Sequence, residues 1–149
     1  GNISIKTAED IAGMRIAGRL ASEVLDYITP FVKTGVTTGE LDRLCHEYMV
    51  NVQGTIPAPL NYCPPGYTPY PKAICTSVND VICHGIPGDK VLKNGDVVNL
   101  DITVIKDGYH GATSRMFFIG EPSILARRLT QITYELLLYT SDAADEGLG

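Results

Sequence analysis

The stretch GDVVNLDITVIKDGYHGATSRMFFIG, residues 95–120, predicts one long β-hairpin. Two runs rich in β-branched and aromatic residues flank Asp107-Gly108, a dipeptide that tolerates the positive φ angles of a two-residue turn. Asp101 lies within the first run, between two apolar residues. We expect it to be buried, where a carboxylate is costly unless it is paired, hydrogen-bonded or bound to a cation. Asp101 is therefore the first candidate functional residue.

The predicted turn fixes the register of the two strands. With residues 107–108 as the loop, Thr103 pairs with Ala112, and two positions further out Asp101 pairs with Ser114. These four side chains share one face because side chains alternate along a strand. Asp101 and position 112 are then diagonal neighbours, roughly 7–8 Å apart at the backbone. Two acidic residues so placed can converge on a metal ion, but position 112 is alanine.

The composition bounds the class of protein. The chain has 149 residues, which suits one domain with a genuine core, and a net charge of −5, which argues against a nucleic-acid surface. No apolar run approaches the ~20 residues that span a membrane, and the N-terminus lacks a signal-peptide pattern. Because Cys45, Cys63, Cys75 and Cys83 lack CxxC spacing, we expect free thiols in a reducing cytosol rather than disulfides.

Two amphipathic helices are predicted before the hairpin. The first begins after Thr7 as N-cap, and its glycines, Gly13 and Gly18, suggest close packing against another element. Its core-facing stripe is Ile11, Met14, Ala17, Ala21, Val24, Leu25 and Ile28. The second begins at a capping box formed by Thr37 and Glu40. Its buried stripe is Leu41, Leu44, Cys45, Tyr48 and Met49, with His46 on the solvated side.

A loop and a histidine lie between these helices and the hairpin. Residues 54–70 hold several prolines and three tyrosines, which predicts a stiffened loop that either packs on the core or forms a wall of an apolar pocket. Strands are predicted at 74–78 and 81–83, joined by a turn. His84 follows the second strand, where side chains project into a cleft, although a lone histidine is more often structural.

The end of the chain breaks the pattern. A third helix is predicted after Pro122, with an apolar stripe that continues to Leu136. The sequence that follows, LLYTSDAADEGLG, stops being amphipathic and resembles the translation of a common sequencing-library adapter. We therefore expect one domain over residues 1–136 and a non-native tail over residues 137–149. A source nucleotide read that continues past this point without an adapter match would contradict that expectation.

Seven short motifs together identify a family resemblance. They are ISIKT at 3–7, TIPA at 55–58, YPK at 70–72, CTSVN at 75–79, CHGIP at 83–87, NLDITV at 99–104 and GATS at 111–114. The chain resembles the type I (bacterial-type) methionine aminopeptidases, and the match covers about Asn2 to Glu135. Taken together, these motifs are far more specific than any one of them.

The resemblance implies an α/β (α+β) pita-bread fold, in which two similar halves pack around a cleft holding two divalent metals. We expect this chain to hold the first half only, with an antiparallel sheet and flanking helices. The resemblance implies that Asp101 bridges both metals, which would be Co, Mn, Fe or Zn, and that Ala112 occupies the position of a second ligand aspartate. The remaining ligands, a histidine and two glutamates, belong to the second half.

The resemblance also implies substrate contacts. His84 matches a catalytic histidine that contacts substrate and helps to stabilise the reacting centre, while Tyr62, Tyr70 and Cys75 match residues lining the methionine side-chain pocket. The implied activity is removal of the initiator methionine from nascent polypeptides in the cytoplasm, by a metal-activated water. The ribosome is a further candidate partner, and the parent protein is expected to be a monomer.

We expect the chain as it stands to be inactive, with no metal stably bound. Of five family ligands only Asp101 is present, and transition-metal sites generally need three or more protein ligands. Two classes remain open: a truncated metalloaminopeptidase, favoured by the tail, and a degenerate relative that binds peptides or ribosomes, favoured by Ala112. A single base change would equally explain Ala112. A proline-specific peptidase of the same fold is less favoured, because residues 83–87 match the methionine enzymes.

Overall fold

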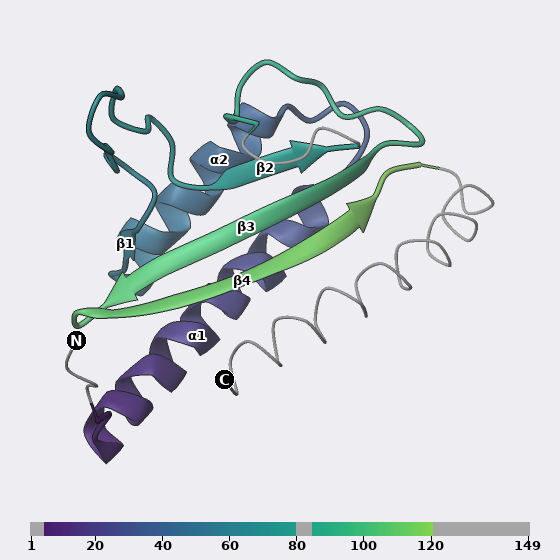
Figure 1. The fold of residues 1–149 in the computed structure, drawn as a ribbon. Helices are drawn as coiled ribbons and strands as arrows, with labels where there is room; N and C mark the ends of the chain where they lie inside the picture. Colours follow the sequence, from purple (N-terminus) through teal and green to yellow (C-terminus); the bar gives the residue numbers. More distant parts are fainter. Residues whose placement is uncertain (1–4, 80–84, 121–149) are drawn as a thin grey trace.

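A computed structural model describes residues 5–79 and 85–120 of the chain (Figure 1). The α-helices are α1, Ala8–Ile28, and α2, Thr38–Glu47. A 3-10 helix, Thr29–Phe31, follows α1, and a π-helix, Tyr48–Gln53, follows α2. The strands are β1, Ile56–Pro57; β2, Cys75–Val78; β3, Val97–Lys106; and β4, Tyr109–Phe118. None of the described helices is long and apolar enough to cross a membrane.

The hairpin of β3 and β4 has the predicted register. Thr103 pairs with Ala112 and Asp101 pairs with Ser114. The antiparallel ladder runs from the Lys106–Tyr109 pair at the turn to the Val97–Phe118 pair. The turn residues have φ angles of 51° at Asp107 and 85° at Gly108, both in the left-handed region. An Asp-Gly pair satisfies this requirement, because aspartate tolerates and glycine favours positive φ.

Strand β3 is the centre of the sheet, because two short strands pair with its second edge. β2 pairs antiparallel with β3 and places Cys75 opposite Asp101, which confirms the strand predicted at 74–78. β1 pairs further along and places Pro57 opposite Val104. The segment 54–70 is therefore not loop throughout, since its beginning forms an edge strand, where a proline without a donor is tolerated.

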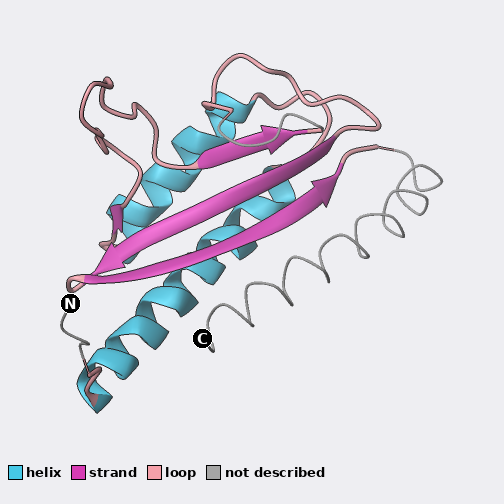
Figure 2. Ribbon diagram, in the orientation of Figure 1, coloured by secondary structure: helices cyan, strands magenta, loops and turns pink. Residues whose placement is uncertain are grey.

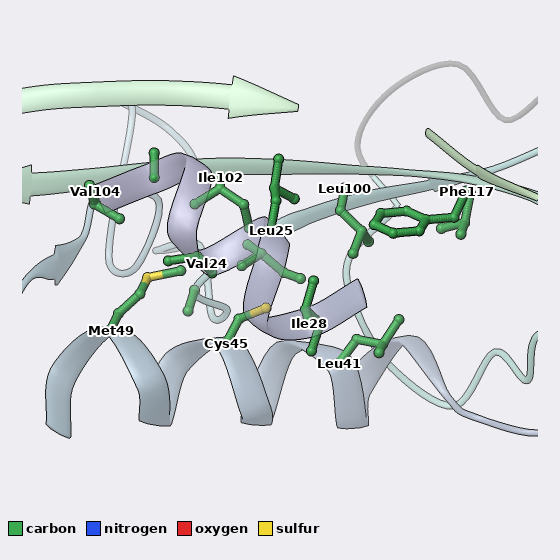
Figure 3. Packing of buried hydrophobic residues seen from close by; sticks show 14 of the residues in the cluster. Val24, Leu25, Ile28, Leu41, Cys45, Met49, Leu100, Ile102, Val104 and Phe117 are labelled. Atoms are coloured by element: carbon green, nitrogen blue, oxygen red, sulfur yellow. The ribbon is translucent and has the colours of Figure 1, made fainter. Parts of the chain in front are cut away.

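Both helices lie on one face of this sheet (Figure 2). The side chains of Leu100, Ile102 and Val104 point toward them from β3 and are fully buried. Figure 3 shows these residues packing with side chains from the two helices, and the core cluster includes Val24, Leu25, Ile28, Leu41, Cys45 and Met49. The opposite face of β3, which carries Asp101, is left uncovered by these helices.

The two helix starts follow from their capping residues. The Thr7 hydroxyl accepts from the Asp10 amide at 3.0 Å, and the Asp10 carboxylate accepts from the Thr7 amide at 3.1 Å, so Thr7 is the predicted N-cap. The Thr37 hydroxyl likewise accepts from the Glu40 amide. The Glu40 carboxylate, however, binds Arg43 instead of reaching back, so only half of the predicted second capping box forms.

The predicted stripe of α1 is wrong at its start. Ile11 and Met14 are 43% and 38% exposed, and the residues of this part of α1 that contact the hairpin are Asp10 and Gly13, which both meet Tyr109. Gly13 does pack closely, since a Cβ there would lie 2.3 Å from the Tyr109 ring. A Cβ on Gly18 would meet nothing within 4 Å, but the Gly18 backbone nitrogen lies against Gly111 of β4, so the helix packs closely there through its backbone.

Candidate substrate and metal site

Asp101 lies in a row of three residues contributed by three strands. Its Cα partners are Cys75 on β2 and Ser114 on β4. The expectation that Asp101 is buried is wrong, because its side chain is exposed. Both helices cover the opposite face, and alternation along β3 turns Asp101 away from them. The carboxylate is therefore stable without a partner, and it is accessible to a ligand.

Ala112 occupies the same face, diagonal to Asp101. Its Cα partner is Thr103, and its side chain is exposed. His110, also exposed, shares this face but is four residues along the strand from the Asp101 pair, about 13 Å at ~3.3 Å per residue. The described parts of the chain contain no group of three His, Cys, Asp or Glu side chains that could hold a metal ion. The donor set on this face therefore does not fit a two-metal centre.

Tyr70 and Cys75 are brought together beside Asp101. The Tyr70 hydroxyl donates to the Ile74 carbonyl at 2.8 Å. Burial raises the pKa of Tyr70, and its contact with Cys75 raises it further. Burial also raises the pKa of the Cys75 thiol, with an opposing effect of the Tyr70 hydroxyl and a further increase from the nearby Asp101 carboxylate. Both groups are thus neutral at pH 7 and form an uncharged, polarisable surface next to the carboxylate.

Tyr62 is joined to Tyr70 only through the main chain. The Tyr70 amide donates to the Tyr62 carbonyl at 2.7 Å, and the Asn61 amide donates to the Tyr70 carbonyl at 2.8 Å. These bonds join the two ends of the loop over residues 61–70, which stands away from the sheet in Figure 1. The Tyr62 side chain is 65% exposed. The side chain of Tyr62, predicted to line the pocket, is therefore open to solvent.

His84 lies outside the described residues, as do the strand predicted at 81–83, the helix predicted after Pro122 and the tail 137–149. The described residues next to His84 are anchored. Gly85 forms an antiparallel bridge with Thr76, whose hydroxyl donates to the Gly85 carbonyl at 3.0 Å.

One buried carboxylate was missed by reasoning from sequence. Asp42 on α2 is 5% exposed, and its carboxylate accepts from the amides of Ala73 and Ile74, just before β2. The available signal was its place beside Leu41 and three residues before Cys45, both on the buried stripe of the helix.

A cavity of about 240 Å³ lies away from Asp101. It is lined by Thr38, Thr76, Val78, Asn79, Gly85, Ile86 and Lys90. The Thr76 side chain is buried and alternates with Cys75 along β2, so this cavity opens on the other face of the strand. It was not predicted from the sequence, and it is separate from the Tyr70–Cys75–Asp101 group.

The class of protein follows from its sequence and fold. The sequence profile of metallopeptidase family M24 matches residues 12–148, and the chain belongs to that family. Within it, the chain is similar to methionine aminopeptidases: it is 60% identical to methionine aminopeptidase of Escherichia coli over 136 residues, which are 91% of this chain and 50% of that protein. The chain spans about half the length of the curated relatives it matches.

Solved structures agree with this assignment. The crystal structure of methionine aminopeptidase from Rickettsia prowazekii matches with a TM-score of 0.80 and 52% identity, over 92% of this chain and 53% of that one. Methionine aminopeptidase from Thermotoga maritima matches with a TM-score of 0.76 and 29% identity, over 93% of this chain and 53% of that one. The resemblance to type I methionine aminopeptidases and the partial pita-bread fold are confirmed.

Proposed function

We propose that this chain provides one side of a methionine-aminopeptidase site, in a protein that removes the initiator methionine from nascent polypeptides. In this proposal Asp101 is a metal ligand, and Tyr62, Tyr70 and Cys75 receive the methionine side chain. His84 is the catalytic contact to the substrate. The identity of 60% to the Escherichia coli methionine aminopeptidase supports this activity. The metal would be Co, Mn, Fe or Zn, and the partners would be nascent N-termini in the cytoplasm.

The observation that carries the proposal is the pairing of Cys75 with Asp101. The β2–β3 register places the thiol and the carboxylate side by side on the open face. Tyr70, whose hydroxyl lies against the thiol, adds an aromatic side chain to this group. A methionine thioether is flexible and polarisable and makes favourable contacts with aromatic rings, and an uncharged cysteine behaves as a small apolar side chain. A substrate methionine bound at Tyr70 and Cys75 therefore presents its own main chain to Asp101.

We further propose that the chain by itself does not hydrolyse peptides. Asp101 has no carboxylate partner at position 112, and a site that activates water generally needs three or more protein ligands. The assay is methionine release from the tripeptide Met-Ala-Ser with added Mn²⁺ or Co²⁺. We expect no release above the level of Asp101→Ala. Release that Asp101→Ala abolishes would contradict the inactivity and support the aminopeptidase assignment.

Ala112 favours a second candidate function, that of a non-catalytic relative which binds peptide N-termini or ribosomes. Such a protein retains the side-chain pocket and needs no metal. A titration of Met-Ala-Ser followed by the Tyr70 and Cys75 resonances in NMR spectra tests this function. Metal-free binding that weakens in Cys75→Ser, with no binding of Glu-Ala-Ser, would support it. The same weak response to both peptides would exclude this second function.

A further inference from the structure

Asp42 is the only charged residue in the buried class among residues 5–79 and 85–120. One of its oxygens, Oδ1, accepts from the Ala73 amide at 2.9 Å and from the Ile74 amide at 3.0 Å. Hydrogen bonds from amides to a carboxylate are shorter and stronger than bonds between neutral groups. A buried carboxylate therefore holds a main-chain segment that lies 31 and 32 residues further along the chain.

The segment held by Asp42 connects two of the proposed pocket residues. Ile74 immediately precedes Cys75, the first residue of β2, and its carbonyl accepts from the Tyr70 hydroxyl. The two main-chain polar groups of Ile74 are thus bonded on opposite sides, the amide by Asp42 and the carbonyl by Tyr70. A shift of this residue would move Tyr70 and Cys75 together.

We propose that Asp42 is a positioning residue for the methionine side-chain pocket, acting through its bonds to the Ala73 and Ile74 amides. By fixing the start of β2, it sets the place of Cys75 beside Asp101 and the orientation of the Tyr70 hydroxyl. The inference rests on the proposed function, because it assigns Tyr70 and Cys75 to the pocket. It adds a residue on α2, which does not itself reach the open face of the sheet.

A purely electrostatic role is the alternative. The Asp42 charge raises the pKa of Cys75, of Tyr70 and of Cys45, although in each case burial is the larger cause. The two roles predict different effects of an asparagine at position 42. The carbonyl oxygen of an amide accepts two hydrogen bonds, so Asp42→Asn keeps both bonds and removes the charge. Asp42→Ala removes the bonds and the charge together.

Alkylation of the cysteines by iodoacetamide, followed peptide by peptide in a mass spectrometer, separates these roles. Cys63 is exposed and gives the reference rate, whereas Cys45 is fully buried and reports opening of the whole fold. Glu47→Ala is the matched control, since Glu47 lies on the same helix and its exposed carboxylate bonds Arg43, which is also exposed.

We expect Asp42→Ala to accelerate alkylation of Cys75 about tenfold relative to Cys63, as expected when buried amides lose their acceptor. Asp42→Asn and Glu47→Ala should stay within about twofold of the unchanged chain, with Cys45 slow in all variants. Equal Cys75 rates in Asp42→Ala and the unchanged chain would overturn the proposal. So would an Asp42→Asn rate equal to that of Asp42→Ala, because charge alone would then be responsible.

A second measurement needs no variant and covers the case in which Asp42→Ala fails to fold. Hydrogen exchange in the unchanged chain should show the Ala73 and Ile74 amides at least about a hundredfold slower than the exposed loop amide of Gly66. Exchange at the loop rate would overturn the proposal. If these results hold and Met-Ala-Ser does not bind the unchanged chain, the proposed function fails while the positioning by Asp42 stands.

Discussion

Gly111 on β4 lies directly against the backbone of Ala17 on α1. A Cβ on Gly111 would lie 2.2 Å from the carbonyl carbon and oxygen of Ala17. This contact seats the first helix on the hairpin, and because both partners are backbone it cannot relax by a side-chain rotation. The packing of α1 on the hairpin therefore depends on a glycine that follows His110 and precedes Ala112.

Gly111→Ala should destabilise the chain by about 3 kcal/mol, the upper part of the range for overpacking. Gly18→Ala is the matched control, because a Cβ there meets nothing within 4 Å and alanine favours helix. It should stabilise the chain by about 0.5–1 kcal/mol. Urea unfolding of both variants measures the two free energies. A neutral Gly111→Ala would show that α1 and β4 do not approach this closely.

The hydrogen bond from the Tyr109 hydroxyl to the Asp10 carboxylate, 2.8 Å long, joins the hairpin turn to the start of α1. The bonds from the Thr7 amide and Tyr109 hold the pKa of Asp10 below its usual value of 3.8, so their stabilisation is present above that pH and is lost as pH falls. The same bond raises the pKa of Tyr109 above 10.0, so its stabilisation is lost as pH rises past that value.

Tyr109→Phe should therefore lower the melting temperature most between about pH 5 and pH 9, with a smaller difference outside that window. Thermal melts at a series of pH values measure the difference from the unchanged chain. Tyr67→Phe, at an exposed tyrosine of the loop, is the control and should change the melting temperature at no pH. A Tyr109→Phe effect that is constant from pH 2 to pH 9 would show that the bond does not involve an ionised Asp10.

Asn79 ties the end of β2 to the start of β3. Its φ angle is 57°, its amide donates to the Val97 carbonyl, and its side chain accepts from the Val97 amide and donates to Asp96. Asn79→Ala loses the side-chain bonds and places alanine in the left-handed region, which should cost about 2 kcal/mol. Asn79→Gly loses only the bonds and should recover about 1 kcal/mol of this. Equal losses of unfolding free energy in Asn79→Ala and Asn79→Gly, measured in urea, would show that the left-handed backbone at this position contributes nothing to the cost.

The hairpin could be predicted from sequence in detail because a two-residue turn permits only one register. Asp107-Gly108 fixed the pairing of Asp101 with Ser114 and of Thr103 with Ala112, and the structure confirms both pairs. The two helix starts were predictable for a similar reason, since a threonine cap acts on an amide only three residues away. Local chemistry determines these features.

Features that depend on which element covers which face were harder to predict. Asp101 was expected to be buried because its neighbours in sequence are apolar, yet those neighbours face the helices and Asp101 does not. The alternation of apolar Leu100 and Ile102 with polar Asn99 and Asp101 already indicates that Asp101 faces away from the core. Asp42 was missed because its partners, the amides of Ala73 and Ile74, lie far away in the sequence.

The claim that this chain by itself binds no metal ion is tested most directly by calorimetric titration with Mn²⁺ and Co²⁺. Three proteins are compared: the unchanged chain, Asp101→Ala, and Ala112→Asp, which restores a carboxylate diagonal to Asp101. We predict that the unchanged chain is indistinguishable from Asp101→Ala, and that Ala112→Asp binds at least about tenfold more tightly, because two carboxylates then share the ion. Micromolar binding by the unchanged chain, lost in Asp101→Ala, would contradict the claim that Asp101 without a partner carboxylate holds no metal ion.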